Sequence, residues 1–491
     1  MGEEQKAINK HEGISKRHQS IVLSVVVLGT LMGALDTTIV LLAFPVINDS
    51  LNSNFVTSIW IILAYLLVIA VTTTQMGRIG DIYGRSKIFN IGFAVFTVGS
   101  ALCGLSPHIL LLIAFRAVQA AGGAIMQANS GAIIADVFPR ENRGRAYGYT
   151  ALGYTSGAML GIVLGGIITT YVSWQYIFFI NIPIGVIAVI AGLRYLKDTT
   201  KNPAKLDLFG IVLFAVSLIC LSLGLIDFTT RGFSRISLTL IAVGVLLLPV
   251  FILYDRRLKN PMIDFEAFKN KVLRNALLAV FFLSIGYFSV VFLLIMYLQG
   301  IRALLPLDAS LLLVPGYVAG SFLGPVMGRL SDKYGSREIA TLGIFFLCIA
   351  IFIYLTLDAS SPFYIVLLGS AISGLGTSMF FPANNSAVMA NARAGSFGSI
   401  SGLLRTLQNI GILGSFVLAI SVAAAAIPRQ VAFEVFIGTA NLTGGVSNEF
   451  ISGIDSAFYV SLAILFVAGV LSFIRGRESR RKSHGTRFFE V

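Results

Sequence analysis

The chain has 491 residues, of which 56% are hydrophobic and only 12% are charged. Soluble proteins carry roughly 25% charged residues, so this composition excludes an ordinary soluble fold and predicts a protein embedded in lipid. The net charge of +13 would indicate nucleic-acid binding in a soluble protein, but membrane proteins gather Lys and Arg in the loops beside their spans. We therefore expect the lipid bilayer, and no nucleic acid, to be the partner of these charges.

Apolar runs long enough to cross a bilayer recur along most of the chain. A hydrocarbon core of about 30 Å requires about 20 apolar residues in one helix. Applying that length predicts an all-α integral membrane protein with fourteen spans, at 21–47, 56–75, 88–106, 109–137, 146–171, 175–196, 207–227, 236–254, 275–298, 307–327, 339–357, 362–390, 398–426 and 456–474.

The positive charges predict how these spans are oriented. If the N-terminus is taken as cytoplasmic, all but six of the 36 Lys and Arg residues fall in cytoplasmic segments. Because Lys and Arg are enriched on the cytoplasmic side, we expect a plasma-membrane protein whose tails, 1–20 and the basic 476–491, are both cytoplasmic. The exceptions are Arg116, Arg231, Arg235, Arg302, Arg405 and Arg429.

A repeated segment divides the chain into two halves. The run 77–85 (GRIGDIYGR) returns as 328–336 (GRLSDKYGS), in both cases on a short loop between two spans. Internal repeats of this kind place the binding site of a transporter between the halves, near the membrane midplane. The spacing of the copies exceeds what six helices need. We therefore predict six-helix bundles at 21–196 and 275–475, joined by two inserted spans and their linkers at 197–274.

The residues of the repeated loop predict a conformational gate. Glycines allow helix ends to turn sharply and approach each other closely. Asp81 can pair with a neighbouring helix end, and Arg85 can hold the loop at the anionic inner leaflet. The predicted cytoplasmic gate comprises Gly77, Asp81, Gly84, Arg85, Asp136, Gly328, Asp332 and Gly335.

Three further motifs accompany this loop, at 35–45 (LDTTIVLLAFP), 116–122 (RAVQAAG) and 174–183 (WQYIFFINIP). Together the four resemble the signatures of the major facilitator superfamily, and in particular its fourteen-helix drug:proton antiporter branch, over roughly residues 20–425. The resemblance implies two six-helix bundles with two extra central helices, transport by alternating access, and a functional monomer.

Two positions depart from the pattern of that branch. Leu41 stands where the first-helix motif usually has Asn, and 161–166 reads GIVLGG where the fifth-helix motif usually reads Gly-Pro-x-x-Gly-Gly. Ile162 therefore replaces the proline of the motif that is the branch's main sign of export. The departure concerns the direction and coupling of transport, and it leaves the predicted fold untouched.

Glycines spaced four apart form one face of the fifth span and one face of the tenth. Small residues at this spacing allow helices to pack closely in lipid. In the family the two spans correspond to helices that meet across the halves. We expect either a sliding seam or ordinary tight packing at the interface glycines Gly157, Gly161, Gly165, Gly320 and Gly324.

Two buried charges are candidates for proton coupling. Asp36 lies within the first span and Arg116 within the fourth, at depths that differ by about 6 Å at 1.5 Å per residue. A charge at bilayer depth must pair or face a cavity. One interpretation is that Asp36 takes up and releases a proton beside Arg116, and the alternative is a fixed ion pair. Arg405, in the thirteenth span, has no obvious acidic partner, and the sequence assigns it no role.

Aromatic and amide side chains within the spans predict a substrate site suited to lipophilic or amphipathic molecules. Each of these side chains is alternatively a packing residue whose polar group is satisfied internally. The candidates are Trp60, Tyr65, Gln119, Gln127, Asn129, Tyr154, Tyr297, Gln299, Asn384, Asn385 and Gln408.

The sequence contains no nucleophile–base arrangement, no ATP-binding phosphate loop and no Cys/His cluster. We therefore expect no enzyme, no cofactor and no metal, and an ion gradient as the source of energy. The leading hypothesis is a secondary transporter that exports drugs or toxic metabolites in exchange for protons. The alternatives are a proton-coupled symporter or facilitator of a small metabolite, and a membrane scaffold or receptor that transports nothing.

Overall fold

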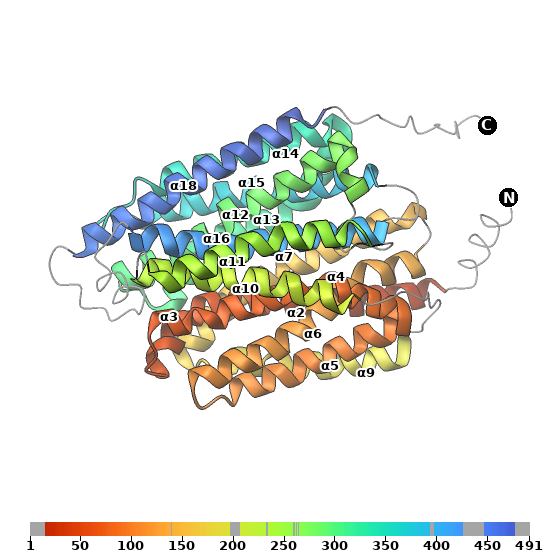
Figure 1. Cartoon of the computed structure of the whole chain (residues 1–491), viewed down its shortest axis with the longest axis horizontal. Helices are drawn as coiled ribbons and strands as arrows, with labels where there is room; N and C mark the ends of the chain where they lie inside the picture. The colour runs from red at the N-terminus through yellow and green to blue at the C-terminus, as the bar shows by residue number, and fades with distance from the viewer. Residues whose placement is uncertain are drawn as a thin grey trace.

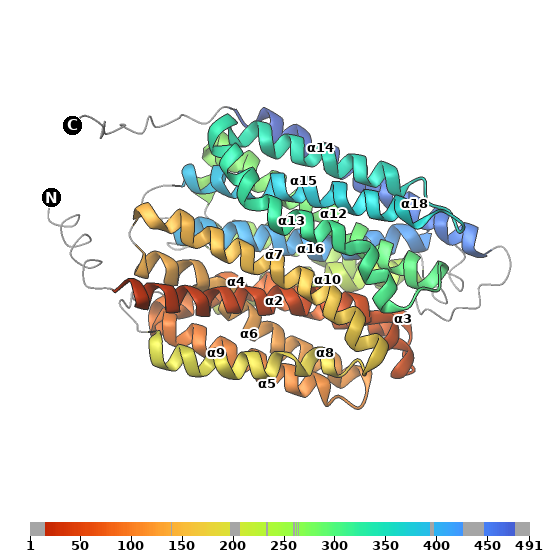
Figure 2. The same ribbon diagram turned by 180° about the vertical axis from the view of Figure 1, so that it is seen from behind.

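The computed structural model describes residues 15–138, 140–196, 207–231, 234–258, 261, 263, 265–392, 397–425 and 446–476. Within these residues fourteen helices are long and apolar enough to cross a membrane, which confirms the predicted number. They lie side by side in one elongated bundle (Figures 1 and 2). The first of these helices begins, and the last ends, at the same end of the bundle, as an even number of spans requires. Of the predicted tails, residues 15–20 and 476 are described, and residues 16–20 form the start of the first helix; the rest of both tails lies outside the described residues.

The first half contains six spans, and the sixth is interrupted. Pro183 lies in the first turn after the interruption, where the missing backbone N–H of proline costs least. The elements of this half are α2 (Lys16–Ser50), α3 (Phe55–Ser58), α4 (Trp60–Tyr83), α5 (Arg85–Gly104), α6 (Ile109–Val137), α7 (Arg140–Tyr171), α8 (Tyr176–Phe179) and α9 (Asn181–Tyr195).

The second half also contains six spans. Its first span ends in a short π-helix, and its other long helices are continuous. The elements are η1 (Phe265–Lys269), α12 (Lys271–Met296), η2 (Tyr297–Ile301), α13 (Pro306–Tyr334), α14 (Ser336–Tyr354), α15 (Phe363–Ala390), α16 (Phe397–Ala425) and α18 (Val446–Ile474).

In the sequence, the two halves are separated by α10 (Leu208–Arg231) and α11 (Arg235–Asp255), which pack against each other. We refer to these two helices as the inserted pair. Outward-facing apolar residues such as Leu246, which is 66% exposed, leave a surface for lipid. The inserted pair lies in front of the bundle in Figure 1, where α10 contacts both α4 and α16. After α11, the carbonyl of Pro261 accepts a hydrogen bond from Arg78 of α4 at 2.5 Å.

The repeated loop produces the same backbone turn in both halves. Gly84 joins α4 to α5 with φ +108°, and Gly335 joins α13 to α14 with φ +111°. Side chains other than glycine are strained at such positive φ values, which explains why glycine is required at both turns. We refer to the end of the bundle that holds these turns as the Gly84 end, and to the opposite end as the Arg302 end.

The halves meet along two seams, α4 against α16 and α7 against α13. In the α4–α16 seam the Thr74 and Thr406 hydroxyls lie 2.8 Å apart. In the α7–α13 seam, near the Arg302 end, the backbone N–H of Leu307 donates to the Thr170 hydroxyl at 3.2 Å. The second seam faces the viewer in Figure 2, on the side of the bundle opposite the inserted pair.

Of the two alternatives for the interface glycines, those of α7 agree with ordinary tight packing and not with a seam between the halves. Gly157, Gly161 and Gly165 pack against α2 of their own half, where a Cβ at Gly157 would overlap the Leu31 carbonyl oxygen. The neighbouring Gly166, which was not among the predicted interface glycines, meets α13. A Cβ there would lie 2.9 Å from the Cα of Leu307.

The interface glycines of α13 do not meet the first half either. A Cβ at Gly320 would lie 3.7 Å from Thr377 of α15, within the second half, and a Cβ at Gly324 would meet nothing within 4 Å. A spacing of four residues identifies the face of a helix that is smooth, but it does not identify the helix that covers this face.

Candidate functional site

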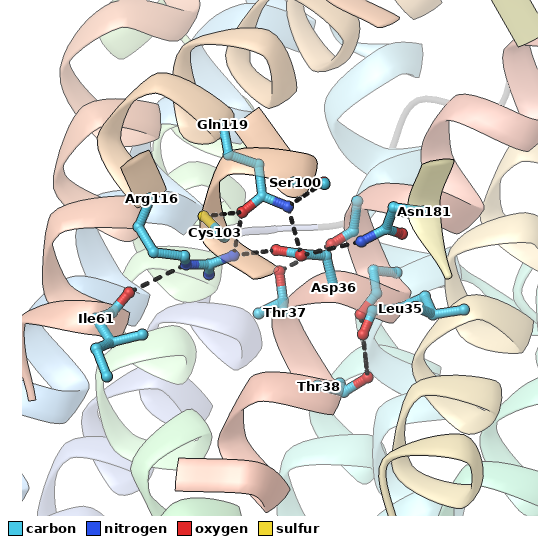
Figure 3. Close-up of polar contacts among 12 residues, drawn as sticks. Leu35, Asp36, Thr37, Thr38, Ile61, Ser100, Cys103, Arg116, Gln119 and Asn181 are labelled. Carbon is cyan, nitrogen blue, oxygen red and sulfur yellow. Dashed lines mark hydrogen bonds and ion pairs between the residues drawn. The ribbon is translucent and has the colours of Figure 1, made fainter. Parts of the chain in front are cut away.

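Asp36 lies near the middle of α2 with its side chain fully buried. Its Oδ2 accepts a hydrogen bond from Nη1 of Arg116 on α6 at 2.6 Å, which completes a buried ion pair (Figure 3). The proximity predicted from the depths of the two residues is therefore present. Because the pair is out of contact with water, it must be stabilised by hydrogen bonds to its remaining atoms.

Gln119, one turn after Arg116 on α6, supplies two of these bonds. Its Nε2 donates to Oδ1 of Asp36 at 2.7 Å, and its Oε1 accepts from Nη1 of Arg116 at 2.6 Å. The same Nε2 also donates to the hydroxyl of Ser100 on α5 at 2.6 Å. Gln119 was predicted to contact substrate, but here its amide bridges the two charged groups (Figure 3).

Arg116 has neighbours that do not depend on Asp36. Its Nε donates to the carbonyl of Ile61 on α4 at 3.2 Å, and its guanidinium lies 4.1 Å from the ring centroid of Tyr65. The Phe178 ring of α8 lies on another side, at 5.7 Å. A cation over an aromatic face is stabilised by the charge distribution of the ring, so Arg116 remains held in place if Asp36 loses its charge.

Asn181 completes the site from α9. Its Nδ2 donates to Oδ1 of Asp36 at 3.4 Å, and the interruption between α8 and α9 places this amide at the start of a helix facing α2. Asn181 lies in the motif 174–183, but no role of its own was predicted for it, and Ser100 was not predicted as a site residue. Both could have been found as polar residues in otherwise apolar spans, the signal that selected Asp36.

The turn of α2 that carries Asp36 also contacts α7. The hydroxyl of Thr38 donates to the carbonyl of Ala158 at 3.1 Å, and the Leu35 carbonyl lies directly against Gly161. Residues on either side of Asp36 thus touch the helix that forms the α7–α13 seam with the second half. The glycines of α7 are what allow α2 to approach so closely.

The predicted gate residues of the first half come together at the Gly84 end. Nε of Arg85 lies 2.7 Å from Oδ1 of Asp81, and its Nη1 lies 3.0 Å from Oδ2 of Asp136. The cluster therefore joins the loop between α4 and α5 to the end of α6. Gly77 lies against Ala128 of α6, where a Cβ would be 3.8 Å from the Ala128 Cβ.

The second copy of the loop keeps the turn but has different charges around it. Gly335 adopts the same positive φ as Gly84, and Gly328 faces Pro382 of α15. Arg337 pairs with Glu338 at 2.9 Å, within the first turn of α14. The side chain of Asp332 lies outside the described residues.

Several predicted substrate residues pack within one half. Asn129 donates to the Met76 carbonyl of α4 at 3.2 Å, and Asn384 donates to the Ala276 carbonyl of α12 at 3.1 Å. Trp60 is the first residue of α4 and packs against the buried core. The neighbours of the two amides belong to the same half, so these contacts indicate packing within a half and not a substrate site between the halves. Asn385 lies beside Asn384 on α15 at a partly exposed position.

Two other predicted substrate residues, Tyr297 and Gln299, lie in η2 towards the Arg302 end. The Tyr297 hydroxyl donates to the Asp358 carbonyl at 2.6 Å, and Nε2 of Gln299 donates to the Leu42 carbonyl across the halves at 3.1 Å. Hydrogen bonds from Ser360 lower the pKa of the Asp358 carboxyl, which lies in the connection between α14 and α15. The Tyr297 contact joins a helix end to a connection, which indicates a structural role, and the Gln299 contact links the two halves.

The remaining candidates, Tyr154, Gln127 and Gln408, lie between the halves. Nδ2 of Asn409 on α16 donates to Oε1 of Gln127 on α6 at 2.8 Å. Gln408 accepts a hydrogen bond from Arg405 at 3.1 Å, and Tyr154 on α7 interacts electrostatically with the same arginine. The structure thus separates a charged site inside the first half from a polar and aromatic cluster between the halves.

Comparison with known families agrees with this architecture. Residues 26–415 match the Major Facilitator Superfamily. The chain belongs to the major facilitator superfamily. As a member of this superfamily, it is a multi-pass membrane transporter of small molecules and not an enzyme.

Relatives within the superfamily carry different cargoes. The chain is 33% identical over 395 residues to the riboflavin transporter RibZ of Clostridioides difficile, a match that covers 79% of this chain and 85% of RibZ. It is 29% identical over 497 residues to the tetracenomycin C resistance and export protein of Streptomyces glaucescens, covering 94% and 92% of the two chains. It is 27% identical to the multidrug resistance protein Stp of Mycobacterium tuberculosis, covering 92% of each chain.

A solved transporter structure shares the fold. The crystal structure of a bacterial homolog of the human lysosomal transporter Spinster, inward-facing and unoccupied, aligns with a TM-score of 0.65 over 94% of this chain and 97% of that chain. The two sequences are 16% identical, so the similarity is one of fold alone.

Proposed function

We propose that this transporter exports lipophilic or amphipathic compounds, such as drugs or toxic metabolites, in exchange for protons by alternating access. The observation that carries the proposal is Asp36, a fully buried carboxylate held by Arg116, Gln119 and Asn181. An ionisable group at membrane depth is a candidate for proton transfer by default. Export is supported by the relatives that are named for resistance and export.

Protonation of Asp36 would remove the negative charge that Arg116 faces. Arg116 would keep the Ile61 carbonyl, Gln119 and the Tyr65 ring as neighbours. α2, by contrast, would lose the electrostatic attraction that holds Asp36 against Arg116 of α6. Since α2 supplies only the carboxylate, we expect α2 to move relative to α6 when the proton binds. A proton thereby changes the packing of a helix and not only a local charge.

The movement of α2 would reach the second half through α7. Thr38 and Leu35 contact α7 on either side of Asp36, and Gly166 and Thr170 of α7 contact α13. The chain of contacts is continuous from the carboxylate to the α7–α13 seam. It supplies a physical connection between proton binding and the relative position of the two halves.

The remaining assignments complete the proposal. The excess of Lys and Arg at the Gly84 end supports a cytoplasmic location for this end and for both termini in the plasma membrane. The Arg85 cluster would then act as a cytoplasmic gate that is made and broken as the halves move. We further propose the division into 21–196, 197–274 and 275–475, and a functional monomer.

A second candidate is a proton-coupled symporter or facilitator of a small metabolite. Two observations favour it: Ile162, fully buried in α7, replaces the proline of the export motif, and the relative RibZ is named as a riboflavin transporter. The two candidates share the site at Asp36 and differ in the direction of coupled transport.

The test uses inverted membrane vesicles with an acidic interior and three lipophilic dyes, one cationic, one neutral and one anionic. We expect the wild-type protein to accumulate at least one dye, and Asp36→Asn to lose accumulation while still exchanging dye down its gradient. Asp49→Asn is the matched control, since Asp49 is an exposed carboxylate on the same helix.

Two results would contradict the proposal. Undiminished accumulation by Asp36→Asn would remove Asp36 from the coupling mechanism. Accumulation that occurs only in right-side-out vesicles, driven by protons moving inwards, would reject export in favour of the second candidate.

A further inference from the structure

Arg405 on α16 is a partly buried cation for which the described residues supply no carboxylate. Its Nη1 donates to the Gln408 amide oxygen at 3.1 Å, and the ion pairs found in the described part of the chain involve Arg85, Arg116 and Arg337. An isolated charge at membrane depth costs several kcal/mol. None of the described carboxylates therefore neutralises the charge of Arg405.

The residues beside Arg405 place it between the two halves and not against lipid. Thr406 meets Thr74 of α4 at 2.8 Å, and Asn409 meets Gln127 of α6 at 2.8 Å. Tyr154 of α7 interacts electrostatically with Arg405 itself. Three helices of the first half thus face the short segment of α16 that carries the charge.

Tyrosine side chains of the first half lie beside the same segment. A Cβ on Gly131 of α6 would lie 3.7 Å from both the Tyr147 ring of α7 and the hydroxyl of Ser401, one turn before Arg405 on α16. A Cβ on Gly123, one turn before Gln127 on α6, would lie 3.2 Å from the hydroxyl of Tyr65. Tyrosines provide flat apolar faces together with a polar hydroxyl, and such surfaces are common in sites that bind aromatic ligands.

We propose that Arg405 binds the anionic group of the transported molecule, and that this molecule is an aromatic carboxylate or a close analogue of one. The guanidinium offers paired N–H donors that fit the two oxygens of a carboxylate, and Gln408 holds it in position. The surrounding tyrosines contact the aromatic ring. The inference rests on the proposed function because it names the class of cargo that the exporter carries.

A carboxylate is not the only anion that could neutralise Arg405. Chloride has the same sign of charge and could occupy the position alone, without an aromatic ring. The tyrosines favour the organic anion, because chloride gains nothing from aromatic faces arranged around the cation. The experiment therefore includes both anions.

The test measures binding to the purified protein in detergent, without a proton gradient. The probes are 2-naphthoate and its uncharged isostere 2-naphthamide, and binding is followed by calorimetry. We expect the wild type to prefer 2-naphthoate by at least about tenfold, equivalent to about 1.4 kcal/mol. Arg405→Gln should abolish the preference, whereas Arg405→Lys, which keeps the charge but loses the paired donors, should retain only part of it.

Arg337→Gln is the control for net charge. It removes the same charge from an arginine that pairs with Glu338 at the Gly84 end, so it should leave the preference unchanged. The comparison of the two probes on the wild-type protein remains informative even if Arg405→Gln does not fold.

Three results would overturn the inference. They are equal binding of both probes by the wild type, a preference that survives in Arg405→Gln, and Arg405-dependent binding of chloride with no binding of 2-naphthoate. Because no proton gradient is present, failure of proton coupling leaves this measurement intact. Conversely, a protein that exports only neutral or cationic dyes would satisfy the proposed function and contradict the inference.

Discussion

Arg116 in the first half and Arg405 in the second are the same residue type in very different surroundings. Arg116 faces a carboxylate, an amide, a backbone carbonyl and an aromatic ring, all from its own half. Arg405 has one amide from its own helix and a tyrosine from the other half. The difference shows that two halves built on one repeat can surround an intramembrane arginine differently: a carboxylate of its own half neutralises Arg116, whereas by our proposal a ligand neutralises Arg405.

The largest effect that we expect is a difference in stability between Arg116→Gln and Arg405→Gln. Arg116→Gln leaves the Asp36 carboxylate buried without its partner, which should destabilise the protein by about 3–5 kcal/mol. Arg405→Gln removes a charge that lacks a carboxylate, so stability should stay the same or rise. Thermal unfolding in detergent measures both, and equal losses in the two variants would show that Arg405 has an ion-pair partner after all.

The glycines of α7 and α13 provide the next comparison. Gly157→Ala places a methyl group against the backbone of α2 and should destabilise by about 3 kcal/mol, at the upper end of the cost of overpacking. Gly324→Ala meets open space and should cost little. Thermal stability and transport should fall together in the first variant, and a large loss in the second would show that another conformation brings a helix against Gly324.

The two repeated turns should respond alike, in contrast to the arginines. Gly84→Ala and Gly335→Ala each force a Cβ onto a residue with φ above +100°, at a cost of about 1–2 kcal/mol. Matched losses of thermal stability would confirm that the backbone repeat is equivalent in both halves. A loss at one turn alone would limit the requirement for glycine to that half.

The smallest effect concerns the hydrogen bond across the α4–α16 seam. Thr74→Val and Thr406→Val each remove one hydroxyl of a pair 2.8 Å apart, so each should cost about 1 kcal/mol. The double variant should cost no more than either single one. Additive losses in a double-mutant cycle would mean that the two hydroxyls bond elsewhere.

Hydrophobic length and the repeated loop were sufficient to predict most of the fold from the sequence. All fourteen spans are present, because a bilayer imposes one length on every helix that crosses it. The interruption between α8 and α9 was not predicted. The apolar run that contains Pro183 continues through the interruption, so hydrophobic length gives no sign of it.

The candidate site was only partly predictable. Asp36 and Arg116 stood out because a charge inside an apolar span is rare, and their contact follows from their depth. The helix that packs on each row of glycines was not predictable, because the spacing of the glycines identifies one face of a helix but not the neighbour that covers it. The amides were also ambiguous, because the same side chain can bridge charges, as Gln119 does, or join two helices, as Asn129 does.

Because the inserted pair lies on one side of the bundle, the two seams between the halves are not equally covered. α10 and α11 cover the α4–α16 seam (Figure 1), whereas in the described part of the chain no comparable pair covers the α7–α13 seam (Figure 2). A hydrophobic cargo already dissolved among the acyl chains would therefore find one flank shielded and the other open to sideways approach. Such a cargo could be collected directly from the membrane without first passing through water.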